Sequence, residues 1–291
     1  MNAWDTLSVR PTADGSLTFF SDRFQEAFHS TFGAKEEAEL KFIEPCRLRE
    51  RLGREPVAIL DVCLGLGYNS AAAVDGLAPL AGFPPVQIVG LEYNPAVLQG
   101  AIAQGLTQIW SPLAQTVLAT LGAGKTFAQG GLTAVVWWGD ARQTVQRVPT
   151  ASVDAVFLDP FSPRRCPELW TWEFLQEVTR CLKPTGYLAT YCCAAAVRAT
   201  LRDLGLHLWA SEPLGRKAPG TIAAWTDGGL PPRCRVLTPL EWDILNTRAG
   251  LPYRDPTLHD PTAVILARRT EEQSRSDRQT SSQWLKRHRS P

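Results

Sequence analysis

Acidic residues follow several short apolar runs, and their placement is typical of a ligand-binding edge. Glu92, Asp140 and Asp159 each lie at the end of such a run. Because the carboxyl ends of parallel strands meet at one edge of an open α/β sheet, we expect these three carboxylates to lie close together. The sequence therefore predicts a binding site for a polar ligand at that edge.

A glycine-containing loop follows the first apolar run, close to Asp61. Gly65 and Gly67 let the backbone approach a ligand at the start of the next helix. We expect Asp61 to accept a hydrogen bond from the ammonium group of a cofactor, and Glu92 to accept two from ribose hydroxyls. Two plainer interpretations stay open, since G-x-G without a third glycine also suits a tight turn and Glu92 suits a solvated strand end.

The third strand ends in a turn at Gly139, which presents the carboxylate of Asp140 at the same edge. In this architecture a carboxylate at that position can recognise an adenine amino group, and we expect Asp140 to do so. Asn69 and Tyr93, which adjoin the glycine loop and Glu92, complete this part of the predicted cofactor site.

The turn Asp159-Pro160-Phe161-Ser162-Pro163 resembles the loop [Asn/Asp]-Pro-Pro-[Tyr/Phe] of amino-group methyltransferases. Methyl transfer to an amine is an in-line displacement, so the enzyme has to hold an uncharged nitrogen in line with the donor. A carboxylate such as Asp159, together with a backbone carbonyl, can accept the N–H bonds of that amine, while an apolar pocket lowers the pKa of the amine. We expect Phe161 either to stack on a base or to pack in the core. The alternative for Asp159 is a helix N-cap.

Local clusters of basic residues have to supply any affinity for nucleic acid, because the net charge of the chain is only +1. Four basic residues flank the predicted edge and are assigned to phosphate or substrate contacts, namely Arg164, Arg165, Arg216 and Lys217. Each of them, taken alone, is equally consistent with a solvated surface charge.

Strand-like apolar runs alternate with helical stretches from Val57 onward, which predicts a doubly wound, mostly parallel sheet in an α/β fold. The runs 206–211 and 221–225 have no helix between them and predict an antiparallel pair. Seven strands with one late antiparallel strand is the Rossmann-like arrangement of class I methyltransferases. We expect an N-terminal extension over 1–56, a catalytic domain over 57–270, and a polar basic tail over 271–291 that is disordered.

The composition excludes several other classes of protein. The seven cysteines are odd in number and form no C-x-x-C pair, so we expect neither a zinc site nor a disulfide framework, and no metal. The N-terminus lacks the basic start and apolar run of a signal peptide, and no window approaches the roughly 20 apolar residues that span a bilayer. We therefore expect a cytoplasmic protein that does not bind a membrane.

Several segments, in order along the chain, resemble one family. It is the methyltransferase part of the bifunctional tRNA 5-methylaminomethyl-2-thiouridine biosynthesis protein, with its stand-alone relatives. The similar segments are TADGSLTFFSDRFQEAFHSTFGAKEEAELKF (12–42), DAVFLDPFSPRRCPELWTWEFL (154–175), LATYCCAAAVRATLRDLGL (188–206), GRKAPGTIA (215–223) and PYRDPTL (252–258).

The resemblance implies N-methylation of 5-aminomethyl-(2-thio)uridine at the tRNA wobble position, with S-adenosylmethionine as the methyl donor. It implies that Asp159 is the catalytic residue and that Gly65, Gly67, Glu92 and Asp140 surround the cofactor. His29 and Ser30 would line the mouth of the site, and we include His29 among the cofactor-binding residues. The tRNA anticodon stem-loop is the expected partner.

Three departures from the family pattern stand out. Cys63 replaces the first glycine of the loop, and Cys166 replaces an asparagine. The FAD-dependent oxidase half is absent from this sequence, so we expect no flavin. Another enzyme would then have to make the aminomethyl group and hand it on.

Other functions remain open on the sequence alone. An aminopropyltransferase of the spermidine-synthase type shares the sheet and also presents an aspartate to an amine, although Arg164 and Arg165 do not suit a polyamine. A small-molecule amine methyltransferase and a non-catalytic RNA-binding domain are further alternatives. NAD binding is disfavoured because the chain lacks a full G-x-G-x-x-G fingerprint.

Overall fold

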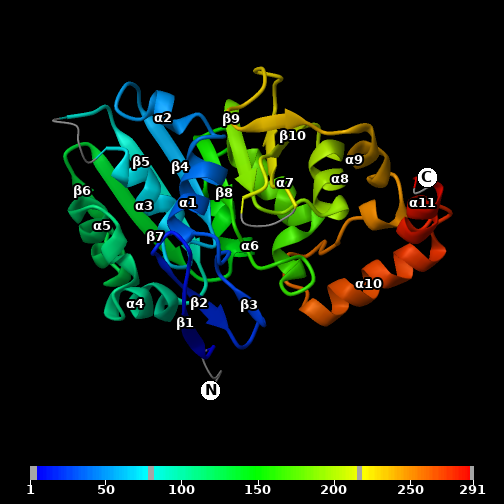
Figure 1. Cartoon of the computed structure of the whole chain (residues 1–291), viewed down its shortest axis with the longest axis horizontal. Coiled ribbons are helices and arrows are strands. Elements are labelled where there is room, and N and C mark those ends of the chain that lie inside the picture. The colour runs from blue at the N-terminus through cyan, green and yellow to red at the C-terminus, as the bar shows by residue number, and fades with distance from the viewer. Residues whose placement is uncertain (1–4, 78–81, 215–217, 289–291) are drawn as a thin grey trace.

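A large twisted sheet with helices on both faces forms the centre of the molecule, which we describe from a computed structural model (Figure 1). The structure describes residues 5–77, 82–214 and 218–288. Nine strands form the sheet in the order β12-β10-β11-β9-β8-β4-β5-β7-β6. Their bounds are β4 Val57–Val62, β5 Val86–Glu92, β6 Phe127–Gln129, β7 Leu132–Trp138, β8 Val153–Leu158, β9 Leu182–Thr190, β10 His207–Ser211, β11 Thr221–Ala224 and β12 Cys234–Val236.

The seven strands that the sequence predicts are all present, and their pairing is the expected one. Strands β4, β5, β7, β8 and β9 are joined by parallel pairs. Strand β11 is antiparallel to both β9 and β10, so it is the late antiparallel strand. The short strands β6 and β12 extend the sheet to nine, one at each edge, which corrects the expected total of seven.

Two hydrophobic cores lie on opposite faces of the sheet, because successive strand residues point to opposite sides. Ile59 belongs to the core under α3, α4 and α5, whereas its neighbour Leu60 belongs to the core under α7 and α8. The near-continuous apolar strands are therefore covered on both faces. The helices are α3 Tyr68–Asp75, α4 Pro95–Ala103, α5 Pro112–Gly122, α6 Ala141–Thr144, α7 Trp172–Cys181 and α8 Ala195–Asp203, with 3-10 turns η2 Leu106–Ile109, η3 Val145–Arg147 and η4 Pro167–Trp170.

Local signals in the sequence explain where these helices begin. Ser111 accepts a hydrogen bond from the amide of Ala114 and precedes a proline, so α5 begins there as a helix separate from α4. Thr171 caps α7 in the same way by accepting from the amide of Phe174. These caps fix the lengths of the crossovers and so the positions of the loops at the carboxyl edge of the sheet.

The N-terminal extension forms a small three-stranded sheet that lies below the main sheet in Figure 1. A turn at Asp14-Gly15 joins its first two strands. The elements are β1 Leu7–Pro11, β2 Leu17–Ser21, β3 Glu26–Ala27, α1 Ala34–Ala38, the π-helical turn η1 Glu39–Ile43 and α2 Leu48–Arg51.

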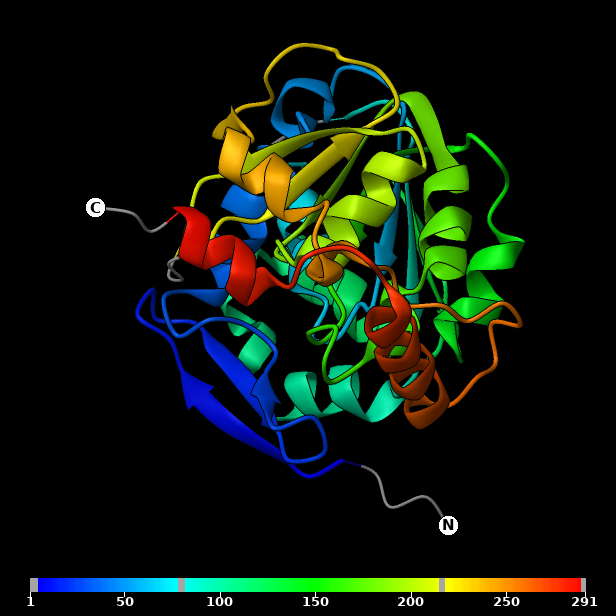
Figure 2. The same cartoon turned by 90° about the vertical axis from the view of Figure 1, so that its right-hand side faces the viewer.

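The C-terminal segment adds α9 (Pro239–Ile244), a 3-10 turn η5 (Arg248–Gly250), α10 (Thr262–Arg275) and α11 (Ser281–His288). The last two helices lie toward the viewer in Figure 2. The polar composition predicts a disordered tail, but α11 is helical, because Trp284 is buried and donates a hydrogen bond to Asp243 of α9.

Asp260 lies two residues before the first residue of α10. Asp260 does not cap α10, because Pro261 occupies the N-cap position and Asp260 pairs with Arg268 instead. Within the residues that the structure describes, no helix has the length and apolar character needed to cross a membrane.

Candidate active site

A cavity of about 460 Å³ lies at the carboxyl edge of the central strands. Glu92, Asp140 and Asp159 all line it, as their positions in the sequence predict. The N-terminal extension closes one side, and the loop after β8 closes another. Further residues of its wall are Arg23, Phe24, Glu26, Phe28, Cys63, Gly65, Tyr93, Pro160, Phe161, Arg165, Cys166, Glu168 and Tyr191.

The loop after β4 has a backbone that suits close approach to a ligand. Gly65 and Gly67 have φ angles of 54° and 80°, in the left-handed region that favours glycine. A Cβ added at Gly67 would lie 2.5 Å from Cδ2 of Leu118, so a side chain there would force Leu118 to shift. Cys63, which stands where the family has a glycine, also has a left-handed φ of 65°, and the loop keeps a glycine-like course.

Glu92 is held rigidly at the wall of the cavity. Its Oε2 accepts from the amide of Gly65 at 2.9 Å, and its Oε1 accepts from the amide of Asn94 at 2.8 Å. Burial raises the pKa of Glu92, although these amide hydrogen bonds oppose the shift. The carboxylate therefore joins the glycine loop to the end of β5, and each oxygen retains capacity for another donor.

Asp61 is fully buried behind the glycine loop and is incompletely satisfied. Its Oδ2 accepts from the hydroxyl of Ser70 at 2.6 Å, whereas Oδ1 has no hydrogen-bond partner within the described part of the chain. Burial, reinforced by the nearby charges of Asp159 and Glu92, raises the pKa of Asp61 to about 7. A buried carboxylate oxygen without a donor matches the ammonium group of an amino-acid moiety.

Asp159 lies half-buried at the end of β8, where Nδ2 of Asn69 donates to its Oδ2 at 3.0 Å. No described helix begins at this residue, so the N-cap alternative does not apply. Two side chains fix the loop that follows. The hydroxyl of Tyr191 donates to the carbonyl of Pro160 at 2.9 Å, and Nε1 of Trp170 donates to the carbonyl of Phe161 at 2.8 Å.

The ring of Phe161 packs against aromatic rings of the N-terminal extension. It stacks on Phe24 with a centroid distance of 4.3 Å, and it meets Phe28 edge-on at 4.9 Å. Glu26 of the same extension accepts from the amide of Ser162 at 3.1 Å. Of the two expectations for Phe161, packing is the one seen here. The extension thus builds one wall of the site.

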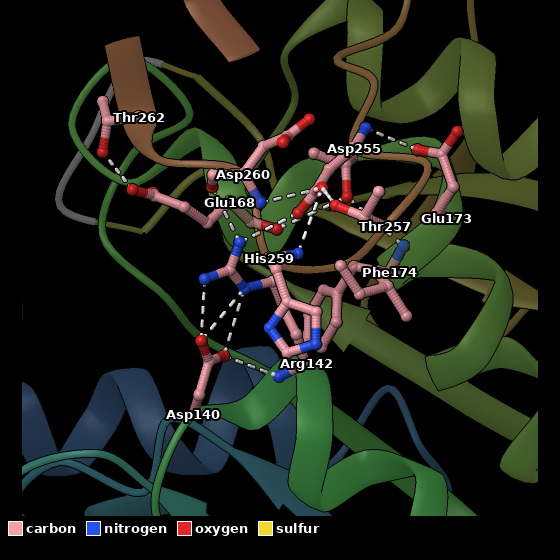
Figure 3. A network of polar contacts seen from close by, with 12 residues as sticks. Asp140, Arg142, Glu168, Glu173, Phe174, Asp255, Thr257, His259, Asp260 and Thr262 are labelled. Atoms are coloured by element: carbon pink, nitrogen blue, oxygen red, sulfur yellow. Dashed lines mark hydrogen bonds and ion pairs between the residues drawn. The ribbon is translucent and has the colours of Figure 1, made fainter. Parts of the chain in front are cut away.

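A network of charged residues holds Asp140 in place (Figure 3). Asp140 caps α6 by accepting from the amide of Arg142, and the guanidinium of Arg142 lies against the same carboxylate, with Nη2 at 2.7 Å from Oδ2. Nη1 of Arg142 also donates to Asp255 at 2.8 Å and to the carbonyl of Asp260 at 2.9 Å. The C-terminal segment therefore helps to fix Asp140 on the wall of the cavity, through Arg142.

Asp255 completes this network from a fully buried position. Its Oδ1 accepts from the amides of His259 and Asp260, and its own amide donates to Glu173. Residue-by-residue reasoning gave no role to Arg142 or to Asp255. The available signal was the motif PYRDPTL at 252–258, which includes Asp255.

Other residues assigned from the sequence lie around this cavity without lining it. Four of these residues are absent from its wall, namely Gly67, Asn69, Gly139 and Asp61. His29 is buried, stacks on Tyr68 at 4.9 Å and shares a hydrogen bond of 2.9 Å with the hydroxyl of Thr18. It too is absent from the wall.

The four basic residues assigned from the sequence divide between several places. Arg165 lines this cavity, and Arg164 lines a second one. Arg216 and Lys217 fall outside the described residues. Within the described ranges, no group of three or more His, Cys, Asp or Glu side chains is arranged to hold a metal ion.

Comparison with known proteins indicates the class of enzyme to which the chain belongs. Residues 104–226 match the model of a family of S-adenosyl-L-methionine-dependent methyltransferases. The chain is an S-adenosylmethionine-dependent methyltransferase. The matched segment includes both Asp140 and Asp159, which line the cavity described above.

This methyltransferase is similar to the tRNA 5-methylaminomethyl-2-thiouridine biosynthesis bifunctional protein MnmC of Polaromonas naphthalenivorans. It is 28% identical over 222 residues, which cover 72% of this chain and 33% of that protein. The chain therefore spans about a third of the length of this bifunctional relative. The expected resemblance to its methyltransferase part is confirmed.

Two solved structures extend the comparison. MNMC2 from Aquifex aeolicus is 28% identical, with a TM-score of 0.78, and the match covers 94% of this methyltransferase and 87% of that chain. Spermidine synthase from Thermotoga maritima is 14% identical, with a TM-score of 0.50, and the match covers 92% and 81% of the two chains. The second match shows only a shared fold.

Proposed function

We propose that this methyltransferase methylates the amino nitrogen of 5-aminomethyl-(2-thio)uridine at the wobble position of tRNA. The observation that carries the proposal is the position of Asp159. It lies on the wall of the same cavity as Glu92 and Asp140 and is oriented by the amide of Asn69. The similarity to the MnmC proteins, whose name states the product, supports this choice of amine.

The residues around the cavity fit S-adenosylmethionine. Glu92 has acceptor capacity for the ribose hydroxyls, and Oδ1 of Asp61 lacks a donor and would accept from the ammonium group. Asp140 would accept from the adenine amino group while Arg142 fixes its orientation. When bound, S-adenosylmethionine supplies an electrophilic methyl group on its sulfonium.

The side chains near Asp159 would then prepare the amine. An alkylamine is largely protonated at neutral pH and carries no lone pair for attack. The wall formed by Phe161, Phe24 and Phe28 disfavours the charged amine by desolvation, and Asp159 accepts an N–H bond or the proton. The carbonyl of Pro160 can accept a second N–H, since its bond from Tyr191 uses only one lone pair.

A cytoplasmic reaction follows from tRNA as the substrate, and the target would be the anticodon stem-loop. In this proposal another enzyme makes the aminomethyl group, and the methyltransferase acts after it.

One observation favours a second function, aminopropyl transfer to a polyamine. Glu26 and Glu168 add acidic groups to the cavity, and a spermidine synthase shares the fold. Two arginines on the same wall, Arg23 and Arg165, oppose the binding of a cationic polyamine, however. Incubation with putrescine and decarboxylated S-adenosylmethionine should give no spermidine.

Transfer of a labelled methyl group to tRNA tests the proposal. Asp159→Asn keeps the shape of the side chain but removes its charge, so we expect the initial rate to fall by at least about 100-fold, the lower range for a positioned acid–base group. The dissociation constant of S-adenosylmethionine should stay within about threefold of the wild-type value. Asp203→Asn, at an exposed aspartate near the end of α8, is the matched control and should keep the wild-type rate. Wild-type rates in Asp159→Asn would exclude Asp159 from the reaction.

A further inference from the structure

A second cavity, of about 760 Å³, lies behind the loop that carries Asp159. Pro160 and Phe161 line the first cavity, whereas the next residues, Ser162, Pro163 and Arg164, line the second. One short loop thus separates the two. The remaining wall comes from the start of α8 and from the C-terminal segment, through Ala194, Ala195, Ala196, Arg248, Ala249, Tyr253, Arg269, Thr270, Gln273, Ser274, Thr280 and Ser281.

Three arginines supply all the charge on this wall, since no acidic side chain lines it. Arg248 donates to the carbonyls of Ser276 and Arg278, at 2.7 and 2.9 Å. Carbonyl groups fix a guanidinium in place but do not neutralise its charge.

Arg269 is held in the same way, by the carbonyls of Leu251 and Ala249, both at 3.0 Å, and its guanidinium lies 4.3 Å from the ring centre of Tyr253. Arg164 is exposed at the rim. Within the described residues, no carboxylate lies within ion-pair distance of Arg164, Arg248 or Arg269. The wall therefore carries positive charge that no direct ion pair among the described residues neutralises.

Two further properties of this wall favour an anion. Burial lowers the pKa of Arg269, and the charge of Arg164 adds to this effect, while Tyr253 and Glu272 oppose it. Helix α8 begins at the wall with Ala194 as its N-cap, which offers no side-chain acceptor to the first amides. Arginines beside a helix start and several hydroxyl groups are the donors that phosphate oxygens need.

We propose that the second cavity binds phosphate groups of the RNA backbone next to the target nucleotide. This inference rests on the proposed function. The shared loop would let one RNA strand place its reactive base in the first cavity and an adjacent phosphate in the second. With a net charge of only +1, the protein needs such a local cluster to hold RNA.

The salt dependence of RNA binding tests the site directly. Arg164→Gln removes one charge from an exposed position, so it should not disturb folding. We expect the slope of log affinity against log salt concentration to decrease by about 0.7–0.9 relative to wild type, the value for one phosphate contact. Arg54→Gln removes an equally exposed charge just before β4, at the opposite edge of the sheet, and should leave the slope unchanged. Both variants should bind S-adenosylmethionine as wild type does.

The outcomes separate this site from the proposed function. If wild type methylates tRNA but Arg164→Gln and Arg54→Gln have the same slope, the phosphate site is refuted and the function stands. If no tRNA is methylated but Arg164→Gln still lowers the slope, the site stands and the substrate assignment fails. If Arg164→Gln weakens only the binding of inorganic phosphate, measured by calorimetry, the cavity holds a free anion and the RNA proposal is overturned.

Discussion

Asp61→Asn should stabilise the ligand-free methyltransferase at alkaline pH while weakening its cofactor binding. Asp61 is fully buried, and its pKa of about 7 lies well above the ordinary value of 3.8. The folded protein therefore holds a proton on Asp61 that the unfolded chain has released, and stability is lost as the pH rises from about 4 to about 7. The amide of asparagine keeps the shape of the side chain without the charge.

The size of the effect follows from the shift in pKa. A difference of about 3 units, at about 1.4 kcal/mol per unit, gives on the order of 4 kcal/mol over the whole range. Between pH 5 and pH 8 this contribution changes by about 3 kcal/mol. If the protonated aspartic acid and the asparagine are equally stable below about pH 4, the variant should be the more stable by about 1.5 kcal/mol at pH 5 and by about 4 kcal/mol at pH 8.

Urea unfolding of cofactor-free protein in reducing buffer at the two pH values measures this difference. Other titrating groups act in both proteins, so their contributions largely cancel in the comparison. Calorimetry on the same samples should show S-adenosylmethionine binding to the variant at least about tenfold more weakly, as expected for loss of a charged hydrogen bond. A stability difference that is the same at pH 5 and pH 8 would refute the raised pKa and the argument built on it.

Two further predictions concern the support of the site. Arg142→Lys keeps the charge but loses the forked guanidinium that bridges Asp140 and Asp255, so we expect the dissociation constant of S-adenosylmethionine to rise about tenfold. The control variant Arg147→Lys should leave that constant unchanged. Equal affinities of the two variants in isothermal titration would count against the network. Gly67→Ala should lower the free energy of unfolding by about 2 kcal/mol or more in urea titrations, because a left-handed φ and contact with Leu118 both oppose a side chain. Gly124→Ala has a φ of 71° but open space around it, and an equal loss there would show that the contact contributes nothing.

Sequence periodicity and strand-end logic predicted the arrangement of the sheet and its ligand-binding edge well. Glu92, Asp140 and Asp159 line one cavity because parallel strands present their carboxyl ends together. That rule depends only on the order of strands and helices, and alternating apolar runs reveal this order. It says nothing about segments that reach the edge from elsewhere in the chain.

Several features that the sequence did not predict depend on such distant contacts. Phe24 meets Phe161, and Arg142 meets Asp255, across more than a hundred residues of chain in each case. The tail was expected to be disordered because its composition is polar, yet the single large side chain of Trp284 anchors α11. Packing of this kind depends on the tertiary structure and leaves little trace in local composition.

The most direct test locates the transferred methyl group. Wild-type protein is incubated with tRNA that carries 5-aminomethyluridine at the wobble position and with isotopically labelled S-adenosylmethionine, and the nucleosides are fragmented in a mass spectrometer. Our account predicts one labelled methyl group on the exocyclic amino nitrogen of that uridine. A label on a ring atom, on a ribose or on another nucleotide would contradict it.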